Sequence, residues 1–472
     1  MTSTPDRDAA VCITIVGYAG THIAESRPMT GARSIRKVVV LGANGAMGSG
    51  SGAVFAAAGI HTVLLARSLE KALAGKIRAE QLGKGRIAAH SITCGTYDGN
   101  LGEIDDADLI FEAVSEDLVT KRELFERIDR AVGPRLRNHE TIVATVSSGL
   151  SIGGMCADRS DGFRACFLGI HLFNPPTIIV GCELVRHAGT DLGIVAIARD
   201  FLSAVIGREV VETRDTPAFA GNRLGFKVLN EVAQHAEHHG VAFMDQLVGT
   251  HTGRALAPLA TVDLVGWDVH KAIVDNLYAT THDVAHDRFK LPAYMQAGID
   301  RGVLGRKAKN GFFKLEGKGP DALKFVLDPL TGDYCPFAEI APPLPAFIKG
   351  MRTALAPRPG REIGHADAME VLCTAIGHEA ELLRSIVLGY ISYGLGLVGE
   401  VVERARDIDR IMGFGFNWAP PGMLVDAIGP ARTIALLERA QLPVPRVVAE
   451  AASHQRAVFN EPSIAASRFF AA

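Results

Sequence analysis

Cysteine is scarce in this sequence: the 472 residues contain seven, and no two of them form a Cys-x-x-Cys pair. An odd number of scattered thiols excludes a disulfide framework as the basis of the fold and provides no pattern of zinc ligands. The first residues also lack the basic segment and apolar run of a secretory signal. We therefore expect a cytoplasmic protein with reduced thiols and no metal site.

The sequence has neither a large net charge nor a long apolar run. Its formal charge is -3 and its pI is near 6.6, so nothing attracts it generally to nucleic acid or to an anionic membrane. The longest uncharged stretch of the C-terminal part, residues 385–399, is shorter than the roughly 20 residues that cross a bilayer. A packed helix explains this stretch better, and we expect neither nucleic acid nor a membrane as a partner.

What the sequence does have is an alternation of apolar runs and helical segments. With 472 residues, 48% of them hydrophobic, the chain is long enough for about three domains of roughly 150 residues each. The pattern predicts strands at 38–41, 62–65, 108–111, 141–146, 166–170 and 178–185, and helices at 47–58 and 120–132. The expected fold class is therefore α/β, with a doubly wound, Rossmann-type domain over residues 35–214 and an irregular extension at 1–34.

The rest of the chain is mainly α-helical by its periodicity. Residues 215–315 form an expected first helical domain and residues 366–472 a second helical unit, joined by a proline-rich linker at 316–365. A weak internal repeat favours this duplication, because Pro, Asp and Gly recur at the same spacing in residues 258–266 and 421–429. Chance similarity of so short a pattern is the alternative.

A glycine-rich turn follows the first strand at once and opens a helix. Its first glycine permits a tight bend, the second lets backbone N–H groups approach a pyrophosphate, and the third lets helix and strand pack closely. Strand, turn, helix and second strand together favour a dinucleotide site over a merely structural turn, with the diphosphate at the positive end of the helix. The residues expected to bind the cofactor here are Gly42, Gly45, Ala46, Met47 and Gly48.

The end of the second strand bears on the choice of cofactor. NAD-binding proteins usually place a carboxylate there to hold the ribose 2′-hydroxyl, whereas this chain has Ala66-Arg67-Ser68. A guanidinium beside a hydroxyl would pair with a 2′-phosphate. Arg67 and Ser68 therefore favour NADP(H) slightly within an NAD(P) site. The alternative is that Arg67 is an exposed strand end and the cofactor is NAD.

A histidine and a glutamate flank a second informative segment. His171 is followed by Leu-Phe-Asn-Pro-Pro, and Glu183 lies in the next apolar run. If the Asn-Pro-Pro segment reverses the chain, the two side chains can face each other. A carboxylate beside an imidazole fixes its tautomer and favours the imidazolium, so His171 could take a hydroxyl proton as hydride leaves the same carbon. A core histidine bound to a backbone carbonyl is the alternative.

Four segments stand out together: Glu112-Ala-Val-Ser-Glu116, Val146-Ser-Ser148, His171-Leu-Phe-Asn-Pro and Asp215-Thr-Pro-Ala-Phe-Ala-Gly-Asn222-Arg. They resemble the signature set of the L-3-hydroxyacyl-CoA dehydrogenase family, and the resemblance runs from about residue 35 to 313. It implies an oxidoreductase of fatty acid metabolism that interconverts (S)-3-hydroxyacyl-CoA and 3-oxoacyl-CoA. Residues 407–429 resemble the second helical copy of longer members that are fused to a crotonase half. This sequence contains no such half, and we expect no enoyl-CoA hydratase activity.

The resemblance also implies roles for single residues. His171 would be the general base or acid, and Glu183 would orient it. Ser148 and Asn222 would hydrogen-bond the 3-oxygen and the thioester region of the substrate. Glu116 and Lys121 would contact the nicotinamide ribose.

Departures from the family pattern leave several alternatives open. The glycine-rich turn is one residue longer than in the family, and Ser147 competes with Ser148 for the substrate contact. The rival functions are a dehydrogenase of a small hydroxy acid without CoA and a non-catalytic dinucleotide-binding protein. Two helical copies allow either a homodimer or a pseudo-dimeric monomer.

Basic residues follow the second strand, in the region where the family grips the CoA phosphates. They either bind the phosphates or form an exposed helix face. These residues are Lys71, Lys76, Arg78, Lys84 and Arg86.

Overall fold

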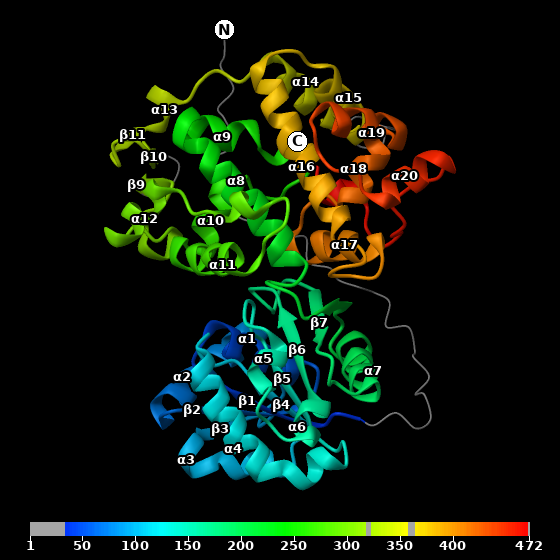
Figure 1. Ribbon diagram of the computed structural model, residues 1–472. Helices are drawn as coiled ribbons and strands as arrows, with labels where there is room; N and C mark the ends of the chain where they lie inside the picture. Colours follow the sequence, from blue (N-terminus) through cyan, green and yellow to red (C-terminus); the bar gives the residue numbers. More distant parts are fainter. Residues whose placement is uncertain (1–33, 318–321, 357–363, 471–472) are drawn as a thin grey trace.

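The structure is a computed structural model that describes residues 34–317, 322–356 and 364–470. An α/β part built on one large sheet is followed by a mainly helical part that lies against one end of it (Figure 1). The buried hydrophobic residues form two clusters that broadly match these parts. Apart from Ser34, the expected extension at 1–34 lies outside the described residues. None of the described helices combines the length and apolar character that a membrane span requires.

The large sheet has eight strands in the order β3-β2-β1-β4-β5-β6-β7-β8. Neighbouring strands are parallel except for the antiparallel pair β6 and β7. β4, β5 and β6 are buried along their full length, which accounts for their continuous apolar sequences. The strand bounds are β1 Lys37–Leu41, β2 His61–Ala66, β3 Ile92–Thr96, β4 Leu109–Glu112, β5 Ile142–Thr145, β6 Phe167–Leu172, β7 Gly181–Arg186 and β8 Glu209–Arg214.

The predicted Rossmann-type sheet is thus confirmed, with shifted strand ends and two additional strands. β3 and β8 were not expected because each carries several polar residues and lacks an apolar run. Both are edge strands of the sheet that the described residues form, and an edge position tolerates polar residues.

Seven α-helices connect these strands. A Cβ at Gly75 would lie 2.4 Å from the carbonyl oxygen of Ala43. Glycine there lets the second helix pack closely against the glycine-rich turn that precedes the first helix. The Asp117 side chain caps the fourth helix by accepting a hydrogen bond from the Thr120 N–H. The helix bounds are α1 Ala46–Ala57, α2 Leu69–Gly83, α3 Tyr97–Asn100, α4 Leu118–Arg137, α5 Ile152–Cys156, α6 Asp161–Cys166 and α7 Leu192–Asp200.

The helical part has one continuous core, to which both expected helical units contribute. The uncharged stretch at 385–399 lies largely within a buried helix, α16. The principal helices are α8 Gly221–His239, α9 Val241–Leu247, α10 Pro258–Val265, α11 Trp267–Thr280, α12 Ala293–Asp300, α14 Ala346–Leu355, α15 His365–Thr374, α16 His378–Gly396, α17 Ala405–Ile411, α18 Pro421–Ile428, α19 Pro430–Arg439 and α20 Arg446–Ser453.

The repeated sequence pattern corresponds to a repeated contact. In α10, the Asp263 carboxylate accepts hydrogen bonds from the N–H groups of Phe312 and Phe313. In α18, the Asp426 carboxylate accepts from two consecutive N–H groups in the same way, those of residues 458 and 459. Each helix ends at a glycine with positive φ, after which the next helix begins. The two copies therefore fasten a later segment by the same device.

The segment expected to be a linker, residues 316–365, differs from that interpretation. It contains most of a three-stranded antiparallel sheet and two helices, and Ile348, Met351 and Leu355 of α14 are buried in the helical core. Its prolines bound these short elements, and the three apolar residues recur at helical spacing. The additional elements are β9 Phe313–Glu316, β10 Leu323–Leu327, β11 Tyr334–Pro336 and α13 Phe337–Ile340.

Candidate active site

His171 and Glu183 face each other on two neighbouring strands. They occupy paired positions of β6 and β7, so their side chains emerge on the same face. The imidazole Nδ1 lies 2.7 Å from Glu183 Oε2. His171 is 4% exposed and Glu183 is fully buried, so the contact is shielded from water.

The N-terminus of α8 fixes the other oxygen of Glu183. Its Oε1 accepts hydrogen bonds of 2.9 Å from the N–H groups of both Ala220 and Gly221, and the positive end of a helix favours a carboxylate. Ala218 and Phe219, just before α8, adopt left-handed backbone conformations with φ of 56° and 55°. Such strained residues persist only where the surroundings hold them, and here they turn the chain so that the N–H groups reach Glu183.

Asn222 follows in the first turn of α8. Asn222 is 6% exposed and directly follows Gly221, whose N–H binds Glu183. The rings of Phe173 and Phe219 lie 4.9 and 5.7 Å from the imidazole ring of His171. Asn222 thus follows directly after a residue that binds Glu183, and two aromatic rings pack against the imidazole.

The glycine-rich turn lies where the strand order reverses, between β1 and β4, and such a switch point is where open α/β sheets bind ligands. Gly42 has φ +100°, and a Cβ there would lie 2.2 Å from the Ala113 carbonyl oxygen. A Cβ at Gly48 would lie 2.1 Å from the Gly42 carbonyl oxygen, so this glycine is needed for packing. At Gly45, the residue before α1, the nearest atom to a Cβ is 3.5 Å away. The absence of a side chain there leaves the positive helix end open, which fits a diphosphate.

Of the two residues predicted to contact a 2′-phosphate, Arg67 and Ser68, only one has a side chain that is not already engaged by a described partner. Arg67 is exposed directly after β2, and no described carboxylate pairs with it. The hydroxyl of Ser68 instead accepts a hydrogen bond from the Lys71 N–H and caps α2. Arg67 is therefore the side chain of the two that is available to a ligand.

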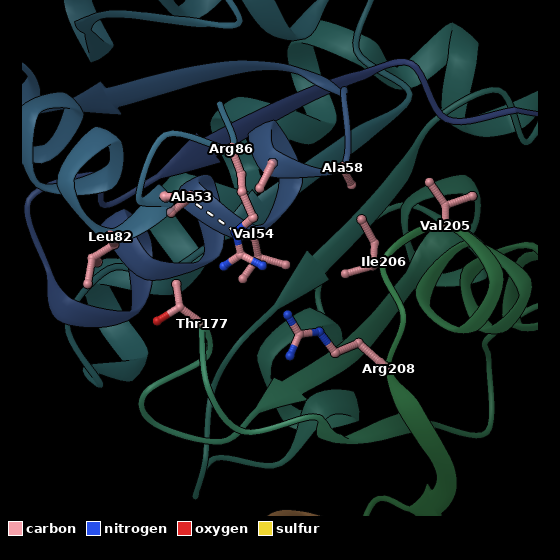
Figure 2. A pocket seen from close by; sticks show the side chains of 11 residues that line it. Ala53, Val54, Ala58, Leu82, Arg86, Thr177, Val205, Ile206 and Arg208 are labelled. Atoms are coloured by element: carbon pink, nitrogen blue, oxygen red, sulfur yellow. Dashed lines mark hydrogen bonds between the residues drawn. The ribbon is translucent and has the colours of Figure 1, made fainter. Parts of the chain in front are cut away.

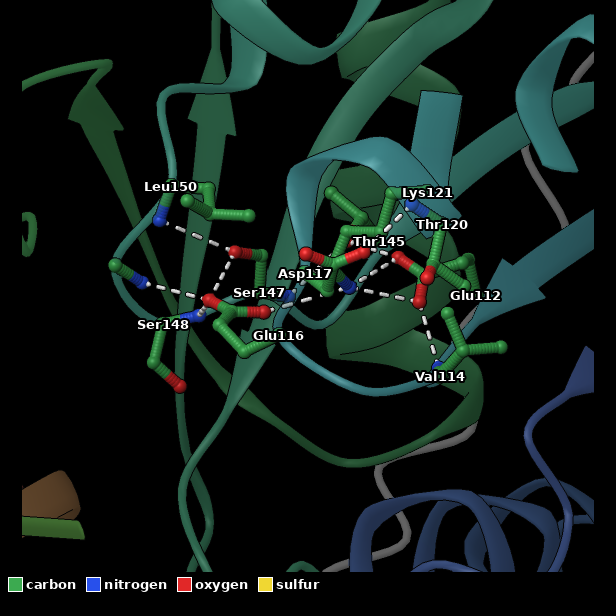
Figure 3. A network of polar contacts seen from close by, with 11 residues as sticks. Glu112, Val114, Glu116, Asp117, Thr120, Lys121, Thr145, Ser147, Ser148 and Leu150 are labelled. Carbon is green, nitrogen blue, oxygen red and sulfur yellow. Dashed lines mark hydrogen bonds and ion pairs between the residues drawn. The ribbon is translucent and has the colours of Figure 1, made fainter. Parts of the chain in front are cut away.

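Glu116 is held by a network of hydrogen bonds (Figure 3). Its Oε1 accepts from the Ser147 hydroxyl and, at 3.1 Å each, from the N–H groups of Ser148 and Gly149. Partial burial raises the pKa of this carboxyl, but the Lys121 charge and these hydrogen bonds outweigh it, so the pKa is lowered overall. Glu116 is thus an ionised acceptor at neutral pH.

Comparison with known proteins decides the family. Residues 37–216 match the model described as "3-hydroxyacyl-CoA dehydrogenase, NAD binding domain", and residues 219–315 match that of the "3-hydroxyacyl-CoA dehydrogenase, C-terminal domain". A "Probable 3-hydroxyacyl-CoA dehydrogenase" of Deinococcus radiodurans is 31% identical over 59% of this chain and 83% of its own length. The chain belongs to the 3-hydroxyacyl-CoA dehydrogenase family.

Two further relatives show how far the likeness extends. A "Probable 3-hydroxyacyl-CoA dehydrogenase" of Bacillus subtilis is 29% identical over 89% of this chain, which spans about half (54%) of that relative's length. The crystal structure of a 3-hydroxybutyryl-CoA dehydrogenase from Escherichia coli matches 89% of this chain and 99% of its own, with a TM-score of 0.64 and 19% identity. At that identity the likeness concerns the fold, and it includes the region beyond the family's two matched domains.

Ser147 and Ser148, the two candidates for the substrate contact, have different surroundings in the structure. Ser147 is 2% exposed, and its hydroxyl is occupied by Glu116. Ser148 is half-buried, and its side chain points away from Glu116 in Figure 3. The loop that carries both is tied to the helical part, because the side chain of Asn276 donates to the Gly149 carbonyl oxygen at 3.0 Å.

Lys121 was named from the sequence, but three groups that hold the predicted residues were missed: Glu112, which pairs with Lys121, and the two N–H groups that bind Glu183. Lys121 is almost fully buried, with both oxygens of Glu112 at 2.7 Å and Glu116 Oε2 at 3.4 Å. Glu112 in turn accepts from the Thr145 hydroxyl and the Val114 N–H. A lysine buried this deeply needs an acidic partner, and Glu112 at the end of β4 was the available signal. The other two, the N–H groups that hold Glu183, leave no trace in side-chain patterns.

Within the described ranges, no group of three or more His, Cys, Asp or Glu side chains is arranged to hold an ion.

Proposed function

We propose that this protein interconverts (S)-3-hydroxyacyl-CoA and 3-oxoacyl-CoA with NAD(P), using His171 as the general acid and base. The observation that carries the proposal is the contact of 2.7 Å between His171 Nδ1 and Glu183 Oε2. Because Nδ1 is engaged, Nε2 is the ring nitrogen left for a substrate proton. Membership of the family and relatives named 3-hydroxybutyryl-CoA dehydrogenase support the substrate class.

The two directions use the same pair of side chains. In oxidation, Nε2 of His171 takes the hydroxyl proton while the hydride leaves the same carbon and the C=O bond forms. Glu183 stabilises the imidazolium that results. In reduction, the imidazolium returns the proton to the oxygen. The bound dinucleotide supplies the acceptor or donor of the hydride.

Neutral side chains orient the substrate in this proposal. Ser148 and Asn222 donate hydrogen bonds to the 3-oxygen and thioester region, and hold the reacting carbon in place. Glu116, ionised and fixed by the loop at Ser147–Gly149, accepts from the nicotinamide ribose. Lys121 is enclosed by Glu112 and Glu116, which supports a role in positioning Glu116.

We further propose a preference for NADP(H) that rests on Arg67. Its exposed guanidinium directly after β2 is suited to a 2′-phosphate, and no carboxylate stands at this strand end to repel one. The helical copies share one core within the chain, which favours a pseudo-dimeric monomer over a homodimer.

One assay tests the function. Acetoacetyl-CoA and free acetoacetate are each offered with NADH and with NADPH, and dinucleotide oxidation is followed. We expect turnover of the thioester, with the free acid at least about 100-fold slower because it lacks the remote binding groups. Equal or faster turnover of the free acid would favour a small hydroxy acid dehydrogenase. Dinucleotide binding without turnover of either would favour a non-catalytic protein.

A further inference from the structure

The segment of residues 214–223 joins the α/β part to the helical part and contacts both members of the His171–Glu183 pair. It runs from the last residue of β8 into the first turn of α8. Two of its N–H groups bind Glu183, and the ring of Phe219 lies 5.7 Å from that of His171. The position of this segment therefore affects where the Glu183 carboxylate stands.

The middle of the 214–223 segment keeps its shape only if its ends are held. Ala218 and Phe219 have φ of 56° and 55°, a left-handed conformation that is unfavourable for residues with a Cβ. Without restraint such residues would relax, and the two N–H groups would turn away from Glu183. Holding the carboxylate in place therefore depends on what fastens the two ends of the segment.

A single loop of the second helical unit, residues 399–403 after α16, contacts both ends. At the first end, the Arg214 N–H donates to the Val401 carbonyl oxygen at 2.9 Å, and the Arg214 guanidinium also binds this loop. At the other end, Arg223 Nη1 donates to Glu400 Oε1 at 2.7 Å. The 399–403 loop thus fixes two points that flank the strained residues.

Arg223 is the stronger of these two attachments. Its residue is 3% exposed, whereas Arg214 is exposed, where an ion pair contributes little. Nε of Arg223 donates to the Tyr393 hydroxyl at 2.9 Å, and Nη2 donates to Asp283 Oδ2 at 2.8 Å. The Tyr393 hydroxyl in turn donates to the same Asp283 oxygen at 2.8 Å. With the bond to Glu400, all three guanidinium nitrogens are engaged, so this planar group has one orientation.

Two other arginines with buried nitrogen atoms are held less completely. Arg208 lines a cavity beside α1 (Figure 2) and donates from Nη1 to the Ile179 carbonyl oxygen, while its Nε has no described partner. Arg254 donates from Nη1 to the Thr252 hydroxyl, and its Nε and Nη2 have no described partner. A full set of partners, two of them acidic, distinguishes Arg223 and gives its end of α8 a fixed direction.

We infer that Arg223, held by Tyr393 and Glu400 of the second helical unit, is a positioning residue that fixes the α8 N-terminus and thereby keeps Glu183 beside His171. The inference rests on the proposed function. Arg223 lies two residues beyond the nearer of the two N–H groups that bind Glu183, so a displacement of its side chain reaches them within one turn of helix. The second helical unit thus contributes orientation rather than a proton-transferring group.

The first test compares two buried tyrosines of α16, one turn apart. Tyr393→Phe removes the hydroxyl that joins Arg223 to Asp283. Tyr390→Phe, the matched control, removes a hydroxyl that donates to the Ala419 carbonyl oxygen at 3.0 Å. Both should lower the Tm by a similar amount. We expect kcat for acetoacetyl-CoA to fall about five- to tenfold in Tyr393→Phe, the equivalent of one hydrogen bond, and to stay within about twofold in Tyr390→Phe. Equal kcat in the two variants would overturn the inference.

A double-mutant cycle shows whether Arg223 acts through Glu183. Arg223→Gln should lower kcat about 10–100-fold, and no more than Glu183→Gln does. In the Glu183→Gln background the same substitution should lower kcat less than about threefold further, because the charge that Arg223 positions is already gone. Arg223→Lys keeps the positive charge and should recover part of the loss. Losses that multiply in the double variant would contradict the inference and leave Arg223 a purely structural role. Glu400 is exposed, so Glu400→Gln provides the same cycle if Arg223→Gln fails to fold.

A spectroscopic measurement without substrate separates this inference from the proposed function. A proton held between an imidazole and a carboxylate gives a ¹H NMR resonance far downfield, which is assigned to the His171–Glu183 contact by its absence in His171→Ala. We expect this resonance to move upfield or broaden in Arg223→Gln and Tyr393→Phe and to keep its position in Tyr390→Phe. A resonance that is unchanged in all three variants would refute the positioning role. The expected changes in a protein that fails to turn over acetoacetyl-CoA would support the role of Arg223 in holding Glu183 and refute only the proposed function.

Discussion

The His171–Glu183 pair of the α/β part and Asp409 of the helical part hold a buried acid in different ways. In the α/β part, two buried acids each have a basic partner: Glu112 pairs with Lys121, and Glu183 pairs with His171. In the helical part, Asp409 is fully buried and forms no ion pair with a described cationic side chain. One of its oxygens accepts from the Gly422 N–H at 2.8 Å, and the other has no described hydrogen-bond partner.

The difference concerns what a buried acid can do. A carboxylate paired with an imidazole stabilises the proton that the imidazole takes up, whereas a lone buried carboxyl is most stable when it keeps its own proton. Burial raises the pKa of Asp409 to about 8 and that of Asp263 to about 6. Substitutions of the paired groups should therefore change activity, and substitution of Asp409 should change stability and its pH dependence.

His171→Ala should have the largest effect. Without the proton acceptor, kcat should fall about 10²–10⁴-fold. Dinucleotide affinity, measured by fluorescence titration, should stay near that of the wild type. The matched control is His187→Ala, which removes a second buried histidine of the α/β part and should lower stability but leave turnover. Turnover of His171→Ala at the wild-type rate would place the chemistry elsewhere.

Glu183→Gln should be less damaging. The glutamine oxygen can still accept from the α8 N-terminus, but the imidazolium loses its carboxylate, so kcat should fall about 10–100-fold. The control is Glu212→Gln, an exposed residue of β8. If Glu183→Gln matched Glu212→Gln in kcat, the paired carboxylate would have no part in catalysis.

Arg67→Asp should change the choice of cofactor rather than the rate of chemistry. The ratio of kcat/KM for NADPH to that for NADH should fall about tenfold or more, because a charged hydrogen bond is lost and a repulsion is gained. Arg186→Asp introduces the same charge change at another exposed strand end and should leave the ratio unaltered. An equal ratio in both variants would remove Arg67 from cofactor selection.

Asp409→Asn should have the smallest effect on activity and the clearest effect on pH dependence. The folded pKa of Asp409 lies above the unfolded value, so its stabilising contribution is complete below about pH 4 and is lost as the pH rises through about 8. Between pH 6 and 8 the free energy of unfolding of the wild type should fall by up to about 1.4 kcal/mol per pH unit from this group. Asparagine removes that slope.

Thermal or denaturant unfolding at several pH values measures this slope. Asp161→Asn, at an almost fully exposed side chain, is the control that should retain the wild-type slope. An unchanged slope in Asp409→Asn would show that the buried carboxyl is not the titrating group.

Much of the α/β part could be predicted because its signals are local. The run of Val38 to Leu41 before the turn, and the reversal between His171 and Glu183, each need only neighbouring residues. The edge strands β3 and β8 escaped prediction because partly exposed strands carry polar residues. The packed elements of residues 316–365 escaped because prolines suggest a linker, whereas burial of α14 depends on partners distant in sequence.

The same distinction applies to the candidate site. Side chains of suitable chemistry could be named from the sequence, but their supports could not. The N–H groups of Ala220 and Gly221 lie 37 and 38 residues from Glu183. Backbone donors and long-range pairings depend on how the parts dock, which residue identity does not reveal.

The proton relay of His171 is tested most directly by measuring kcat/KM against pH in both directions on the wild-type enzyme. Reduction of acetoacetyl-CoA requires the imidazolium and oxidation of 3-hydroxybutyryl-CoA requires the neutral imidazole. The rate constant should therefore fall with rising pH for reduction and with falling pH for oxidation. Profiles that fall on the same side in both directions would contradict the relay.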